Sequence, residues 1–226
     1  MSIALRKVLK VLYFFNLKTV YFNFKYLPFR QAIIMPIFVT RRTLLNKTKG
    51  KVIIHSQHVV PGMIRIGHQR VGLFDKKTYR VTWEVEGEVH FYGGALLKYG
   101  SKIIVNKGAI LSIGDKFRLT TNSAVICYKK ITFGNNVIIS WDTIIMDTDF
   151  HKILDLNGNV LNSPREILIG DNVWIGMRVV ILKGTKVEND NIIASNSFLN
   201  KPVSGSFQII AGNPAVVVKT DVTWKE

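Results

Sequence analysis

The chain has 226 residues and one cysteine, Cys127, so it is long enough to bury a full hydrophobic core and has no internal disulfide. Lys and Arg number 31 against 15 Asp and Glu, which gives a formal net charge of +16 at pH 7. This excess of positive charge indicates an anionic partner, such as a membrane surface, a polyphosphate or a nucleic acid.

The first fifty residues form a basic, aromatic-rich segment, in which no Asp or Glu occurs. Apolar residues recur there at helical spacing, at Leu5, Val8, Leu12 and Phe15. This pattern is typical of an amphipathic helix lying on a membrane surface. The longest uncharged run in the segment, Gln31 to Thr40, is far shorter than the roughly 20 residues needed to span a bilayer. We therefore expect residues 1–50 to cap the domain that follows or to dock on a membrane. Nucleic-acid binding has no visible motif to support it.

Short strands separated by Gly-containing turns are predicted after residue 50. The clearest ones are Val52–Ile54, Met63–Gly67, Thr82–Val85, Ile103–Val105 and Ile110–Ile113. We interpret these strands as the irregular first rungs of the repeat described next.

An aliphatic residue then recurs every six positions, most clearly between residues 169 and 204. The column reads Ile169, Ile175, Ile181, Val187, Ile193 and Leu199, and Phe133, Ile139 and Ile145 continue it upstream. The residue four positions after each is mostly small or β-branched, and Gly, Asn and Asp fill the positions between. A period of six fits neither an α-helix nor an ordinary alternating strand. It is typical of a solenoid in which each rung is a short strand and a corner, with Cys127 opening a rung as a small buried residue.

Two segments, residues 169–176 (IGDNVWIG) and 211–215 (AGNPA), closely resemble motifs of the hexapeptide-repeat acyltransferases, and the overall resemblance runs from Ile113 to Lys219. It implies an all-β fold, a left-handed parallel β-helix with three hexads in each coil, in chains that assemble as homotrimers. The expected organisation is an N-terminal segment at 1–50, a β-helix at 51–215 with a catalytic loop at about 146–166, and a C-terminal tail at 216–226.

The hexads stop after Ile145 and resume at Ile167, with a polar loop between them. A solenoid needs only a corner between rungs, so an expelled loop indicates a functional element. In the family this loop carries the catalytic base, and the stretch from Asp149 to His151 resembles it. Imidazole, with a reference pKa of about 6.5, suits removal of a hydroxyl proton near neutrality. Either Asp149 or Asp147 would orient the ring of His151.

The resemblance further implies acetyl-CoA as the acyl donor, held in a groove between neighbouring subunits. Positions that match the family's contacting stretch are Met177, Ser195, Asn200, Lys201 and Lys219. Trp174 follows an inward-facing residue, so it faces outward, into either this groove or a trimer interface. No metal is expected, because the hexads and the loop contain a single histidine, whereas a catalytic zinc needs about three protein ligands.

Candidate acceptor residues lie on the rungs before the loop: Trp141 and Asp142, and, one rung earlier, Asn122 and Tyr128. The sequence therefore predicts an acetyltransferase that acts on a hydroxyl of a sugar in a bacterial cell-surface glycan or its precursor. It would work in the cytoplasm or at the inner face of the membrane. Two alternatives stay open: acetylation of an amino-sugar nitrogen, and a non-catalytic β-solenoid scaffold that binds an anionic polymer.

Overall fold

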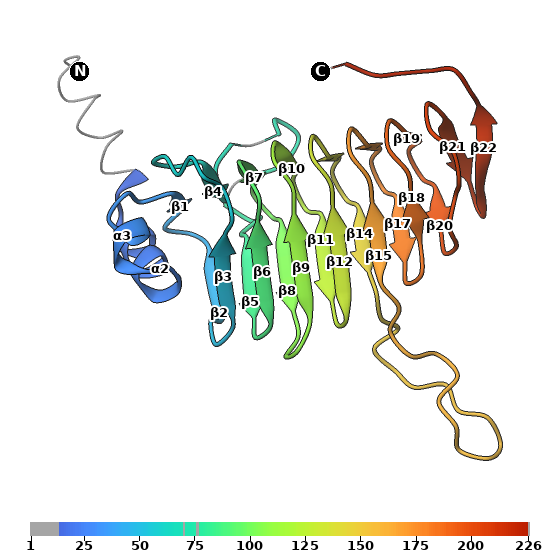
Figure 1. The fold of residues 1–226 in the computed structure, drawn as a ribbon, viewed down its shortest axis with the longest axis horizontal. Coiled ribbons are helices and arrows are strands. Elements are labelled where there is room, and N and C mark those ends of the chain that lie inside the picture. The colour runs from blue at the N-terminus through green and yellow to red at the C-terminus, as the bar shows by residue number, and fades with distance from the viewer. Residues whose placement is uncertain (1–13, 70, 76, 226) are drawn as a thin grey trace.

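The computed structural model describes residues 14–69, 71–75 and 77–225. Three β-sheets form the walls of one solenoid, and each coil of the chain adds a strand to sheet A, then to sheet B, then to sheet C (Figure 1). All strand pairs are parallel except the last, β21 with β22.

The three walls have these strands. Sheet A contains β1 (Ile37–Val39), β4 (Ile64–Ile66), β7 (Ala95–Leu97), β10 (Phe117–Leu119), β13 (Ile138–Ile139), β16 (Trp174–Ile175), β19 (Ile192–Ile193), β21 (Ile209–Gly212) and β22 (Ala215–Lys219). Sheet B contains β2 (Leu44–Lys47), β5 (Thr82–Val85), β8 (Lys102–Val105), β11 (Ala124–Cys127), β14 (Ile144–Met146), β17 (Val180–Leu182) and β20 (Phe198–Leu199). Sheet C contains β3 (Lys51–Ile54), β6 (Glu88–Phe91), β9 (Ile110–Ile113), β12 (Lys130–Phe133), β15 (Ile167–Ile169) and β18 (Lys186–Val187).

The register of the last coils confirms the six-residue repeat. Ile169 lies beside Val187, Ile175 beside Ile193 and Ile181 beside Leu199, so each of these coils is three hexads long. The six side chains of this column are all buried, because alternate residues of each short strand face the interior. Cys127 is buried in the same core, as expected.

The N-terminal helix α2 (Leu17–Tyr26) caps the open edge of the first coil, and α3 (Phe29–Ala32) follows it. The edge strand β1 would otherwise expose unpaired backbone groups. Side chains of α2 and its N-cap satisfy them: Asn23 bonds to both the amide and the carbonyl of Ile37, and Thr19 does the same for Val39. In the described part of the segment, these side chains cover the edge of β1. The amphipathic pattern at Leu5, Val8 and Leu12 lies outside the described residues.

Two predicted boundaries differ from the structure. The solenoid begins with β1 and β2, before residue 51, because both strands pair in register with the next coil. At the other end, the expected tail starts inside β22, which turns back antiparallel onto β21. In the described chain, no helix is long and apolar enough to cross a membrane.

Polar ladders hold the corner between sheets C and A, which we call the C–A corner. Side chains at this corner accept hydrogen bonds from backbone amides of the preceding rung: Asn135 from Asp115, and Asp171 from Asn135. A second ladder runs beside the first, with Asn172 accepting from Asn136 and donating to Asp190 at 2.8 and 2.7 Å. Asn172 has φ +53°, a conformation that Asn tolerates better than most residues. The Asn and Asp residues of the hexads are therefore explained by the corner itself.

Candidate functional site

The interruption of the hexads forms a long loop at the corner between sheets B and C, the B–C corner. The chain leaves the wall after β14, projects far beyond the other turns, and returns at β15 (Figure 1). Lys183, on the next rung, holds the base of this loop. Its ammonium group contacts the Asp149 carboxylate and donates to the carbonyl oxygen of Asn162 at 2.6 Å. The hydrogen bond from Lys183, followed by that from Asn162, lowers the pKa of Asp149.

His151 is presented on this anchored base. Its amide donates to the carbonyl of Asp149 at 2.7 Å, and its own carbonyl accepts from the side chain of Asn162 at 2.8 Å. The backbone is thus fixed from both sides, while the imidazole is exposed to solvent. Among the described residues, no side chain hydrogen-bonds to the ring. The ring is therefore available to groups from outside this protomer.

Asp147 has a different task from the one expected. It is fully buried, and its two carboxylate oxygens accept the amides of Tyr128, Lys129 and Lys130 at 2.6 to 2.8 Å. These contacts close the preceding turn of the B–C corner and leave the carboxylate directed away from His151. Asp147 is therefore not the partner of that histidine, because amides of the preceding rung occupy both of its carboxylate oxygens. Asp149 contacts Lys183 and Asn162 at the base of the loop, and no hydrogen bond joins it to the ring of His151.

The outer half of the loop is a preformed hairpin with an apolar surface. Leu154 and Val160 form an antiparallel bridge, and Asp155 accepts hydrogen bonds from the amides of Asn157 and Asn159 to set the turn. Large apolar side chains are exposed along it: Phe150, Ile153, Leu154, Leu156, Val160 and Leu161. A hairpin that is ordered by its own turn yet exposes this much apolar surface is typical of a segment that packs against another molecule.

The predicted donor-binding residues lie in three separate places on the protomer. Met177 and Ser195 stack on neighbouring rungs of the corner between sheets A and B, the A–B corner, where the amide of Asn196 donates to the carbonyl of Met177 at 3.0 Å. Asn200 and Lys201 follow β20 at the B–C corner. The other two lie in sheet A: Trp174 in β16 and Lys219 at the end of β22.

Trp174 faces outward, as expected, with 40% of its surface exposed. Its indole donates to the hydroxyl of Ser140 at 3.2 Å, and its ring lies 6.2 Å from that of Trp224 in the C-terminal segment. Trp224 in turn donates to the carbonyl of Asn172. Part of the outward face of Trp174 is therefore covered by its own chain.

Three of the four candidate acceptor residues lie away from the loop. Trp141, Asp142 and Asn122 occupy the A–B corner, at the opposite ends of β14 and β11 from the loop. Asn122 and Asp142 hydrogen-bond to each other at 2.7 Å, so they form a corner ladder. These three residues therefore do not lie beside His151, because the loop begins at the other end of β14 and projects outward (Figure 1). Tyr128 alone is near His151: its ring lies 5.3 Å from that of Phe150, the neighbouring residue.

Sequence reasoning missed two residues that build the site, Lys183 and Asn162. Neither stands out locally, since Lys183 occupies an ordinary turn between β17 and β18 and Asn162 lies in the polar run that closes the loop. The signal that would have found Lys183 is the coil length. It places the turn after β17 directly beside the base of the loop after β14, because those two strands are neighbours in sheet B.

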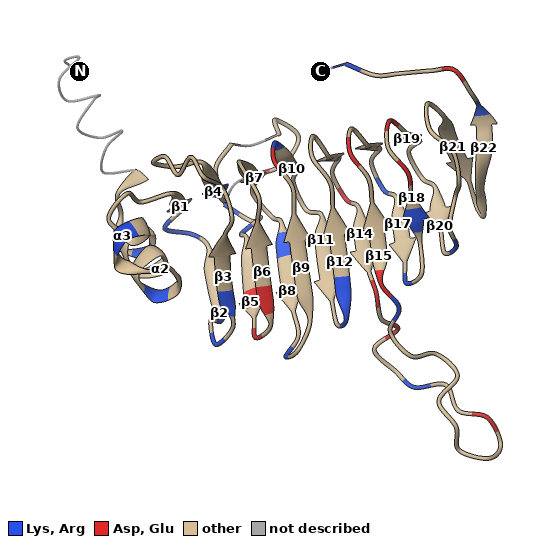
Figure 2. Ribbon diagram, viewed as in Figure 1, with Lys and Arg blue, Asp and Glu red and all other residues tan. Residues whose placement is uncertain are grey.

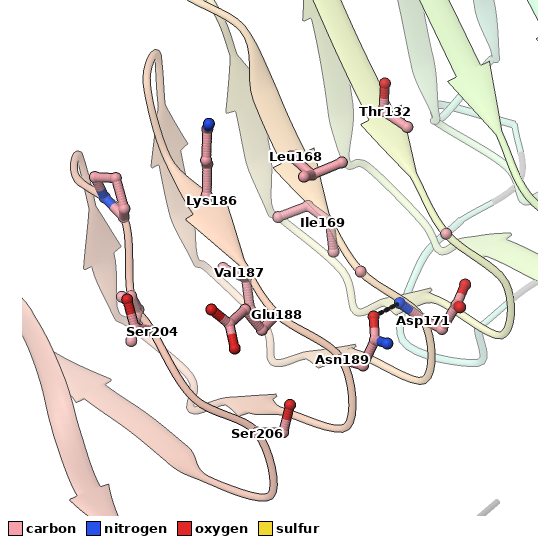
Figure 3. Close-up of a pocket in the computed structure, with 14 residues that line it drawn as sticks. Thr132, Leu168, Ile169, Asp171, Lys186, Val187, Glu188, Asn189, Ser204 and Ser206 are labelled. Carbon is pink, nitrogen blue, oxygen red and sulfur yellow. Dashed lines mark hydrogen bonds between the residues drawn. The ribbon is translucent and has the colours of Figure 1, made fainter.

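A hollow of about 550 Å³ lies elsewhere, on the outer face of sheet C in the last coils (Figure 3). Three of its polar side chains are hydrogen-bonded within the chain: Asp171 accepts from the amide of Asn135, Asn189 accepts from the amide of Asp171 at 2.8 Å, and Glu188 accepts from that of Gly205 at 3.0 Å. None of its lining residues belongs to the loop or to the predicted site. We therefore place the candidate site at the loop. In the part of the chain that the structure describes, no group of three or more His, Cys, Asp or Glu side chains is placed to hold a metal ion.

Comparison with known proteins agrees with this architecture. Residues 166–201 match the family model described as bacterial transferase hexapeptide (six repeats). The chain is 32% identical over 133 residues to a polysialic acid O-acetyltransferase of Escherichia coli O1:K1 / APEC, covering 58% of this chain and 41% of that protein. It is 31% identical over 114 residues to the galactoside O-acetyltransferase of Escherichia coli strain K12, covering 50% and 55%.

Among solved structures, a hexapeptide transferase family protein from Anaplasma phagocytophilum superposes with a TM-score of 0.52 at 16% identity, over 80% of this chain and 86% of that one. This likeness concerns the fold. The chain spans about half the length of the curated relatives it matches. Together with the three-hexad coils, these matches identify the chain as a left-handed parallel β-helix protein that carries the bacterial transferase hexapeptide repeat and is similar to sugar O-acetyltransferases.

Proposed function

We propose that this protein transfers an acetyl group from acetyl-CoA to a hydroxyl of a sugar in a bacterial cell-surface glycan or its precursor. The observation that carries the proposal is the loop at the B–C corner, which fixes the backbone of His151 and leaves its imidazole exposed. The names of the two relatives, both O-acetyltransferases, support the same reaction class.

In the proposed reaction His151 is the general base. The imidazole removes the proton from the acceptor hydroxyl as its oxygen attacks the thioester carbonyl. The carbon–sulfur bond breaks, the sulfur leaves as a thiolate, and the proton passes from the imidazolium to it, giving an acetyl ester and free CoA. A covalent acyl-enzyme is not part of this scheme. Burial and the nearby Asp147 carboxylate raise the pKa of the Cys127 thiol far above its usual range, so this thiol stays protonated.

The outer face of sheet B supports assembly into a trimer. A parallel sheet is normally covered on both faces. In the last five rungs of sheet B the outward positions are almost all apolar: Ile104, Ala124, Ile126, Ile144, Met146, Val180, Leu182 and Phe198. Outward positions of sheet C on the same coils mix apolar and polar residues: Ile110, Ser112, Lys130, Thr132, Leu168 and Lys186. We infer that sheet B packs against copies of this chain.

Such packing would also assemble the site. Within a protomer, Met177 and Ser195 lie at one edge of sheet B and His151 at the other, separated by strands of two to three residues and their corners. A cyclic arrangement through sheet B would bring the A–B corner of one copy toward the B–C corner of the next. The apolar hairpin of the loop would then reach across this junction. The donor-binding residues and the general base would thus come from neighbouring protomers.

The N-terminal end supports contact with an anionic membrane. Beyond the buried side that caps β1, the helices expose Leu17, Tyr21, Phe24, Phe29 and Ile33, and no acidic residue precedes Asp75. Exposed aromatic and aliphatic side chains among cations are typical of interfacial anchors. Sedimentation with anionic vesicles tests this contact. We expect Leu17→Asp with Phe29→Asp to abolish it, since both side chains are exposed and the cap stays intact.

The proposed reaction is tested with purified full-length protein, acetyl-CoA, and a panel of sugars and amino sugars. We expect His151→Ala to lower kcat by about 10²-fold or more while CoA binding is retained. His58→Ala, at another exposed histidine, is the matched control. Equal turnover of His151→Ala and wild type would exclude the mechanism. If only the nitrogen of amino sugars is acetylated, the acceptor is an amine and not a hydroxyl. Absence of both turnover and CoA binding would favour a non-catalytic scaffold.

A further inference from the structure

Cations follow one corner of the solenoid from rung to rung. Sheets B and C are joined by seven connections in the described chain, and six of them carry a Lys or Arg. We call these residues the basic edge: Lys49, Lys107, Lys129, Arg165, Lys183 and Lys201. Figure 2 shows Lys and Arg at one turn after another along the side from which the loop emerges. The second connection is the exception, with Glu86.

The rungs stack, so the basic edge forms a line. Neighbouring strands of a sheet lie about 4.7–4.9 Å apart. The B–C turns that follow neighbouring strands of sheet B therefore repeat at about the same spacing, along a line perpendicular to the strands. A linear molecule lying along this edge would therefore meet successive cations, whereas a flat surface would touch only those that project furthest.

Most carboxylates near the edge are already engaged. Glu86 pairs with Lys47 at 2.9 Å, Asp149 pairs with Lys183, and Glu166 lies 3.8 Å from Lys130. By contrast, four exposed lysines of this edge have no ion-pair partner among the described residues: Lys49, Lys107, Lys129 and Lys201.

This charge is not a general property of the corners. The C–A corner carries Asp115, Asp171, Glu188 and Asp190, and a single lysine, Lys116. Cations are therefore distributed unevenly among the corners, and the B–C corner, which has a cation on six of its seven connections, also contains the loop of His151. Lys129 follows Tyr128, whose ring contacts Phe150 beside that histidine.

We propose that the basic edge binds the acceptor, and that the acceptor is a linear glycan bearing carboxylate or phosphate groups. This inference rests on the proposed function for the identity of the reaction. The chain of the glycan lies along the B–C corner, with its anionic groups on Lys107 and Lys129. The next sugar then reaches the imidazole of His151 beside Tyr128. A line of cations spread over six of the seven connections fits a polymer better than it fits a compact nucleotide.

The test compares two double variants with the same change of net charge. Lys107→Gln with Lys129→Gln removes two cations of the basic edge. Lys77→Gln with Lys116→Gln removes two exposed lysines from the A–B and C–A sides. The probes are alginate oligomers, as a linear carboxylated polysaccharide, and neutral dextran of similar size. Binding to the full-length protein is titrated at low and at physiological salt.

We expect the edge variant to bind alginate about tenfold more weakly than wild type, with a smaller salt dependence, and the control variant to match wild type. Dextran should bind to none of them. Equal weakening in both variants would show that net charge alone is responsible, and no binding by wild type would also overturn the proposal. Loss of affinity for acetyl-CoA in the edge variant would assign the lysines to the donor phosphates instead. Loss of binding to anionic vesicles would assign them to a membrane.

The binding titration needs no turnover, so it separates this proposal from the proposed reaction. Alginate should also inhibit transfer to a small neutral sugar, by competing with the sugar and not with acetyl-CoA. If the basic edge binds alginate but His151→Ala leaves the activity unchanged, the proposed role of His151 is excluded, whereas the glycan-binding site is retained.

Discussion

The C–A and B–C corners have the same geometric task, which is to turn the chain between two sheets, yet they use polar residues in opposite ways. At the C–A corner, the side chains of Asn135, Asp171 and Asn172 hydrogen-bond to neighbouring rungs. At the B–C corner, exposed lysines point outward and the wall opens into a loop that presents His151. Polar residues at one corner hold the solenoid together, and those at the other are available to ligands.

One residue of the B–C corner should behave like the C–A ladders, and it gives the largest expected effect on stability. Asp147→Ala removes the acceptor of three backbone amides and leaves them without a partner. We expect the free energy of unfolding to fall by about 3 kcal/mol, measured by denaturant titration. Asp149→Ala, two residues further on and only half-buried, is the control and should cost less than about 1 kcal/mol. Similar losses for both would contradict the assignment.

The C–A ladder should be sensitive in stability and silent in activity. Asn172→Ala loses two side-chain hydrogen bonds and places alanine at φ +53°. We expect a loss of about 2 kcal/mol, because left-handed backbone and lost hydrogen bonds each cost about 1 kcal/mol. Asn172→Gly should recover roughly half, since glycine adopts positive φ without strain. If kcat falls while the unfolding midpoint is unchanged, the ladder takes part in function and the contrast between corners fails.

Lys183 should show the reverse behaviour. Lys183→Gln removes the cation that holds Asp149 and the base of the loop. We expect kcat to fall about tenfold with the KM for acetyl-CoA unchanged, and the unfolding free energy to change by less than about 1 kcal/mol. Amides of the loop should exchange faster with solvent, and Lys183→Arg should restore part of the activity. Lys186→Gln, an exposed lysine on the next strand, serves as the control.

The smallest effect is a pH dependence confined to the loop. The hydrogen bond from Lys183 lowers the pKa of Asp149, so the folded protein holds this carboxylate ionised to lower pH than the unfolded chain does. The anchoring contribution is therefore complete above the ordinary Asp pKa of 3.8 and is lost as the pH falls through the lowered value. Carboxyl NMR should show the Asp149 titration moving upward in Lys183→Gln. An unchanged titration would show that Lys183 is not its principal partner.

Much of the fold could be predicted from the sequence, because a solenoid is built from a local repeat. Each hexad contains its own strand and corner, so Ile169, Ile175 and Ile181 predict both their burial and their neighbours one coil later. The strand boundaries of the first coils are harder to predict from the sequence. Their strands β1 and β2 pair with partners much further along the chain, and no fixed period marks them.

What the sequence determined by itself is the repeat, the interruption at the loop, and the histidine on it, since each of these is a matter of spacing along the chain. The tertiary structure decided which polar residues are partners. It turned Asp147 toward three amides, joined Lys183 to Asp149, and placed Trp141 and Asp142 at the far corner of sheet B. It also aligned lysines from separate rungs into one edge. The physical reason is that stacking of the coils brings together residues that are one full coil apart in the sequence. The six-residue period by itself fixes only which side of the strand each residue faces.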